Sequence, residues 1–128
     1  MGISIYYSAR RTEPMTSVEQ AAISSLIAEY AIEEQLQDRD RTGEGPNWVS
    51  FCVYQLDDAH FPAEPGVIFE GATGLPDNSE DNFWLGIQHW CALLSKIRRA
   101  VGSAVWSVHI DAHDVYWDEE RQEYDPSA

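Results

Sequence analysis

Apolar and polar residues alternate in two segments of the chain, and this alternation predicts two strands. In residues 3–8, apolar side chains take every second position, as they do in a strand with one buried face. Residues 104–110 repeat the pattern, with Trp106, Val108 and Ile110 on the expected core side. We therefore expect these segments to be the first and the last core strands.

Two other segments are rich in β-branched and aromatic residues. Residues 48–56 predict a strand that is buried on part of both faces. Residues 67–72 predict a shorter strand, which the glycine and proline residues after it bring to an end. We expect these two strands to be antiparallel neighbours. The charged, glycine-containing residues 38–47 are typical of a loop.

The first helix is predicted over residues 17–37. Thr16 stands three residues before Glu19, which is the spacing of a capping box at the start of a helix. Apolar residues then recur at intervals of three and four, while acidic residues occupy the other positions. The apolar stripe consists of Val18, Ala22, Ile23, Leu26, Ile27 and Tyr30.

The second helix is predicted from about residue 79 to Val101, before Gly102. Capping residues and early acids stand at its start, and basic residues stand in its last turns, as the helix dipole favours. Its broad apolar stripe consists of Phe83, Trp84, Ile87, Trp90, Cys91, Leu94, Ile97 and Val101.

The order of these elements, βαββαβ, predicts an α+β fold in a single domain over residues 1–128. Two helices on one face of a mostly antiparallel sheet form a two-layer sandwich, and the order is that of a ferredoxin-like or similar fold. An acidic, aromatic tail at 112–128 follows, either as a hairpin with a turn near 119–121 or as a strand with a mobile end. The apolar content of 44% suits a folded chain rather than a disordered one.

The charge of the chain limits the partners that it can bind. Asp and Glu number 22 against 8 Lys and Arg, which gives a formal net charge of −14. This field repels phosphate backbones and anionic membranes and attracts cationic proteins. We therefore expect a basic protein partner and neither nucleic acid nor membrane binding. The tail residues predicted to contact that partner are Asp114, Tyr116, Trp117, Asp118, Glu119, Glu120, Glu123 and Tyr124.

These features favour a cytoplasmic, non-catalytic binding module, a monomer or weak dimer of the immunity-protein or inhibitor type that captures a partner such as a bacterial toxin. The sequence has no apolar run of membrane-spanning length, no nucleophile elbow and no phosphate loop. We expect no cofactor and no catalytic residues. Cys52 and Cys91 each lie in an apolar run, which predicts buried free thiols.

Two alternatives remain open. If the last strand continues, His109, Asp111 and His113 point to one face, and such a set can bind zinc, manganese or iron. That would make the protein a metal-dependent enzyme or a metal-binding domain, although a solvated strand face is the favoured interpretation. The other alternative is an assembly protein whose exposed sheet edge pairs with a second copy.

Overall fold

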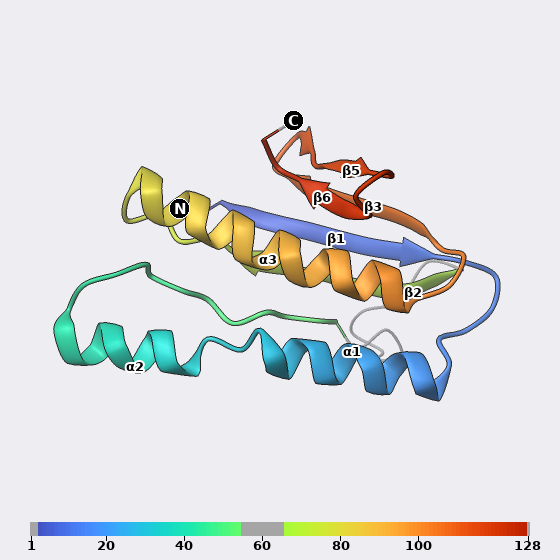
Figure 1. The fold of residues 1–128 in the computed structure, drawn as a ribbon, viewed down its shortest axis with the longest axis horizontal. Coiled ribbons are helices and arrows are strands. Elements are labelled where there is room, and N and C mark those ends of the chain that lie inside the picture. Colours follow the sequence, from blue (N-terminus) through green and yellow to red (C-terminus); the bar gives the residue numbers. More distant parts are fainter. Residues whose placement is uncertain (1–2, 55–65, 128) are drawn as a thin grey trace.

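The structure is a computed structural model that describes residues 3–54 and 66–127. It has an α+β architecture in which the long helix α3 lies along one face of an antiparallel sheet (Figure 1). The elements are β1 (Ser4–Arg10), α1 (Ser17–Glu29), α2 (Glu33–Thr42), β2 (Val67–Gly74), α3 (Glu80–Ala100), β3 (Val105–Ile110), β4 (His113–Asp114), β5 (Tyr116–Asp118) and β6 (Glu123–Asp125).

The main sheet has the order β2-β1-β3-β4, and every pair of neighbouring strands is antiparallel. The first strand, β1, is therefore central, with Ile5 opposite Thr73 on one side and Ile110 on the other. Strands β5 and β6 form a separate two-stranded sheet. The strands predicted at 3–8, 67–72 and 104–110 are confirmed; β1 and β3 begin one residue later than predicted, and β1 and β2 end two residues later.

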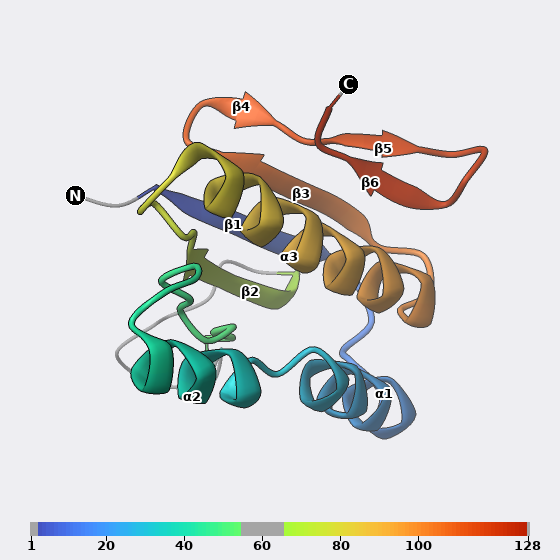
Figure 2. The same cartoon turned by 60° about the vertical axis from the view of Figure 1, so that its left-hand side comes forward.

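The core lies between β1 and α3. Ile5, Tyr7 and Ala9 are buried on one face of β1, as the alternation predicted, and Trp90 and Leu94 of α3 are almost completely buried with them. Each fully buried side chain of the Leu or Ile type contributes about 1.5–3 kcal/mol. Figure 2 shows α3 over the sheet, with α1 on one side of it and the β5–β6 hairpin on the other.

The prediction of one helix over residues 17–37 was wrong, because the chain breaks between α1 and α2. In a continuous helix, Ile32 would lie on the face opposite Ile23, since about two and a half turns separate them. The break instead buries Ile32, which is 2% exposed. It also frees the Tyr30 carbonyl oxygen, which lies 2.8 Å from Nε2 of His89 on α3. Helix α2 then includes residues 38–42, which were predicted as loop.

The strand predicted at 48–56 is not formed in its described part, residues 48–54, and its last two residues lie outside the described ones. This part is irregular and joins β2 through one isolated antiparallel bridge between Val53 and Gly71. The Tyr7 hydroxyl donates to the Cys52 carbonyl oxygen, and a side chain at Gly71 would overlap that same oxygen. The segment therefore crosses close to β2 at a glycine instead of extending the sheet.

These differences leave the broad class intact and the finer topology unconfirmed. The described part of the chain has only β2 between α2 and α3, so the βαββαβ order and the ferredoxin-like fold are not confirmed. The helix predicted at 79–101 is confirmed as α3, with Ser79 as its cap. Cys91 is buried as predicted, whereas Cys52 is exposed, which corrects that prediction. Among the described residues, no helix has both the length and the apolar character needed to cross a membrane.

Candidate functional site

The C-terminal hairpin, residues 116–125, has five acidic residues against one basic residue and is the centre of the candidate site. It confirms the hairpin alternative for the tail. Asp118 closes the turn, because its Oδ1 accepts backbone N–H groups from Glu120 at 3.0 Å and Arg121 at 3.1 Å. Gln122 has a φ of 55° and completes the return of the chain. The Asp118 carboxylate therefore has a structural role in the turn.

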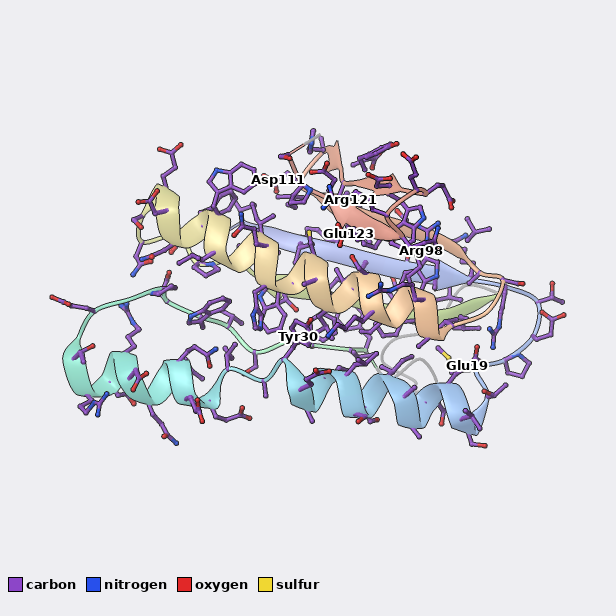
Figure 3. All side chains as sticks on the ribbon, viewed as in Figure 1. Glu19, Tyr30, Arg98, Asp111, Arg121 and Glu123 are labelled. Atoms are coloured by element: carbon purple, nitrogen blue, oxygen red, sulfur yellow. The ribbon has the colours of Figure 1, made fainter. Side chains whose placement is uncertain are left out.

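The hairpin is attached to α3 by buried contacts. Tyr124 is 6% exposed, and its backbone N–H donates to the Ser95 Oγ at 2.8 Å. Arg98 stacks over Trp117, with 4.0 Å from its guanidinium carbon to the ring centroid, and donates to the Tyr124 hydroxyl at 3.2 Å. Burial raises the pKa of the Tyr124 hydroxyl, and the bond from Arg98 partly opposes this rise. Figure 3 shows Arg98 on the part of α3 next to the hairpin.

The structure sorts the predicted contact residues by exposure. Tyr124 is buried against α3, and its side chain packs within the protein rather than on its surface. Trp117, Asp118 and Glu123 are half-buried. Tyr116 is 55% exposed, so it is the aromatic side chain of this set with most surface open to a partner. The exposed members are Asp114, Tyr116, Glu119 and Glu120.

A groove of about 330 Å³ lies between α3 and the hairpin. Trp84 forms part of its α3 wall and is 39% exposed, although the sequence predicted it in the core stripe. Trp84, Gln88 and Ala92 follow at intervals of four, which places them on one face beside the buried stripe. This spacing of four is the feature of the sequence from which the α3 wall of the groove could have been predicted. The lining residues are Trp84, Gln88, Cys91, Ala92, Ser95, Arg121, Glu123, Tyr124, Asp125, Pro126 and Ser127.

The rim of the groove is acidic on the hairpin side. Arg121 pairs with Glu123 at 2.5 Å, and Figure 3 shows both residues on the hairpin. Asp125 Oδ1 accepts from the backbone N–H of Ser127 at 3.0 Å. The exposed Glu119 and Glu120 lie at the hairpin turn, outside the groove lining, and Arg121 is the single base within residues 116–125. The site thus combines an acidic hairpin with a groove wall on α3 that contains Trp84.

The structure does not bring His109, Asp111 and His113 together as a metal site. Asp111 has a φ of 51° and turns the chain, so the strand does not continue to His113. His109 stands opposite Asp114 and His113 opposite Ile110, so the two imidazoles belong to opposite faces of the sheet. His109 Nδ1 lies 2.7 Å from the Asp111 carbonyl oxygen. Across residues 3–54 and 66–127, no three His, Cys, Asp or Glu side chains are placed to share a metal ion.

Comparisons of the chain with protein-family models, with curated proteins and with solved structures find no match. The residue roles proposed below follow from the geometry of the hairpin and its groove.

Proposed function

We propose that this protein is a non-catalytic binding module that captures a basic protein through the C-terminal hairpin and the groove beside it. The observation that carries the proposal is a groove that contains the partly exposed Trp84 and is lined by Glu123 and Asp125, next to a hairpin turn that exposes Glu119 and Glu120. The chain's formal charge of −14 extends the same field over the whole molecule. Such a field favours cationic partners.

The two parts of the site have different physical roles in this proposal. Glu119 and Glu120 lie at the exposed turn, where charges speed the encounter with a cationic partner and contribute little to its retention. Trp84 and Tyr116 offer aromatic surface that a partner can bury, and buried aromatic residues dominate the binding energy of many interfaces. Because Tyr124 and Arg98 hold the hairpin on α3, binding orders little additional chain.

The proposed class is an immunity protein or inhibitor that neutralises a basic toxin, located in the cytoplasm and acting as a monomer or weak dimer. Fast capture and slow release are the two properties that an inhibitor of a harmful protein needs. The exposed carboxylates of the hairpin turn speed the capture, and the aromatic side chains of Trp84 and Tyr116 slow the release.

The first experiment is affinity capture from the source cells, followed by association kinetics with the recovered protein. The variant Glu119→Lys/Glu120→Lys reverses two charges at the turn, and Glu33→Lys/Glu34→Lys makes the same change of net charge on α2. We expect the turn variant to lower the association rate constant about tenfold at low salt, with a weaker dependence on ionic strength. The α2 variant should lower it much less. Equal rates for the two variants, or a captured partner that is not basic, would contradict the proposal.

A second variant tests the aromatic wall. Trp84→Ala removes the open indole from the groove while the turn carboxylates stay in place. We expect the dissociation rate constant to rise about tenfold or more, which corresponds to roughly 1.4 kcal/mol or more of binding energy, with an unchanged association rate. A dissociation rate equal to that of the wild-type protein would remove the groove from the proposed site.

A further inference from the structure

The sheet face opposite α3 carries a polar band that the proposed function does not use. On β1, Tyr6 and Ser8 alternate with the buried core residues and therefore face away from α3. Their antiparallel neighbours extend this face over three strands. One row consists of Glu70, Ser8 and Ser107, and the next row consists of Ala72, Tyr6 and His109.

Short and bulky side chains in this band leave a hollow of about 200 Å³. Ser8 and Ser107 are directly opposite each other and form a low floor. Tyr6 and His109 are stacked, with 5.1 Å between ring centroids and 15° between planes, and form one aromatic side. Tyr54 and Glu70 also line the hollow. The other lining residues are Tyr7 and Gly71.

Glu70 supplies the one carboxylate among the described residues that line this hollow. Tyr54 is held beside Glu70, because its backbone N–H donates to the Glu70 carbonyl oxygen at 2.8 Å. Burial raises the pKa of the Tyr54 hydroxyl, and the nearby Cys52, Glu70 and Tyr6 groups raise it further. Asp114 stands opposite His109 on the neighbouring strand and adds a second carboxylate to this face.

A carboxylate, aromatic rings and hydroxyl oxygens together suit a planar cation that donates several hydrogen bonds. A guanidinium is planar, stacks on aromatic rings and donates several hydrogen bonds in one plane, often as a pair to one carboxylate. We propose that this hollow binds a guanidinium group, with the Glu70 carboxylate as its counter-charge and the Tyr6 ring as its stacking surface. The Ser8 and Ser107 hydroxyls accept the remaining hydrogen bonds.

The guanidinium group can belong to an arginine side chain of a protein or to a small molecule. NMR titrations of the full chain with N-acetylarginine amide and with methylguanidine separate these sources. Tighter binding of the arginine amide identifies a peptide-borne group, and equal or tighter binding of methylguanidine identifies a small molecule. In either case, we expect saturable shifts of the backbone signals of Tyr6, Ser8, Glu70 and Ser107.

Two variants and one control make the titration decisive. Glu70→Gln removes the counter-charge and should weaken binding about tenfold, whereas Glu34→Gln removes the same charge on α2 and should leave it unchanged. Ser107→Val fills the floor of the hollow with a side chain that suits a strand, and it should abolish binding while the rest of the spectrum is preserved. Absence of saturable shifts in the wild-type protein, or equal weakening by both glutamine variants, would overturn the proposal. Because the probes are small, this result does not depend on whether the hairpin captures a protein.

Discussion

Two acidic regions of this protein use their carboxylates in opposite ways. Glu19 lies in the first turn of α1 and accepts hydrogen bonds from Arg11, from the Thr16 backbone at 3.0 Å and from the Gly102 backbone at 3.0 Å. Glu119 and Glu120 lie at the hairpin turn, exposed to solvent. The Glu19 carboxylate joins Arg11 after β1, the start of α1 and Gly102, two residues after the end of α3, whereas the other two carboxylates lie at the surface.

The comparison shows that the number of acids says little about what each one does. The Arg11 and Glu19 side chains are 8% and 12% exposed, and Arg11 also donates to the Gly102 carbonyl oxygen at 2.7 Å. Such a carboxylate is already satisfied within the protein and is not available to a partner. Exposed acids such as Glu120 keep their charge in solvent, where it acts at long range.

The largest expected effect comes from detaching the acidic hairpin from α3. Tyr124→Ala removes a buried ring that packs on Trp117, together with the hydroxyl that accepts a hydrogen bond from Arg98. We expect a loss of about 3 kcal/mol in the free energy of unfolding, measured by urea denaturation. Hydrogen exchange of residues 116–125 should become faster than that of β1. Unchanged protection of the hairpin would show that its attachment does not depend on this ring.

The Glu19 cluster should make stability depend on pH. Hydrogen bonds from Arg11, then from the Thr16 and Gly102 backbone, hold the pKa of the Glu19 carboxyl well below its ordinary value of 4.5. The unfolded chain therefore takes up this proton first, so the stabilisation is complete above about pH 5 and falls as the pH drops below 4.5. We expect Glu19→Gln to lower the melting temperature at pH 7.

The control for this prediction is the pH series itself. The difference in unfolding free energy between the wild-type protein and Glu19→Gln should shrink between pH 5 and pH 3. A constant difference across the series would mean that the charge of Glu19 is not the source of its effect.

Within the hairpin, Asp118 and Glu120 offer a matched pair of acids. Asp118→Ala removes the oxygen that accepts two backbone N–H groups in the turn, and we expect it to cost about 1 kcal/mol. Glu120→Ala makes the same change of charge at an exposed side chain and should change stability by less than about 0.5 kcal/mol. Thermal unfolding of the two variants under one buffer condition measures the difference, and equal costs would contradict the structural role of Asp118.

The smallest expected effect on stability is that of reversing the charges at the turn. Glu119→Lys/Glu120→Lys should stay within about 0.5 kcal/mol of the wild-type protein. A slight gain is consistent with the net charge of −14, because the change reduces repulsion among like charges. Chemical denaturation at low and high salt measures this effect. The Glu119 carboxylate accepts one hydrogen bond, from Gln122 Nε2 at 3.0 Å, at an exposed site. A large loss of stability would show that the turn depends on these carboxylates.

The elements that followed from local patterns are β1, β2, α3 and β3. The alternation in β1 and β3, the β-branched and aromatic residues of β2 and the spacing of three and four in α3 are visible within a few residues. The patterns of β1, β3 and α3 matched the face that the structure buries, except at Trp84. The capping box at Thr16 and the hairpin in the tail are also local features. The net charge followed from composition, which is why the sequence favours a basic partner without identifying it.

Tertiary contacts decided the features that the sequence left undetermined or led us to mispredict. The break before α2 depends on His89, which lies far along the chain from the Tyr30 carbonyl that it contacts. The irregular path of residues 48–54 depends on Tyr7 and Gly71 in two different strands. No pattern in the predicted helix or strand contains this information.

The features of the candidate site also fall into those that the sequence determined and those that tertiary contacts decided. The sequence by itself determined that the tail is acidic and aromatic and that it can form a hairpin. Only the tertiary structure decided that Tyr124 is buried, that Trp84 is open and that His109 and His113 face apart. The periodicity of apolar residues describes one segment by itself, whereas the burial of a side chain depends on which distant segment packs against it.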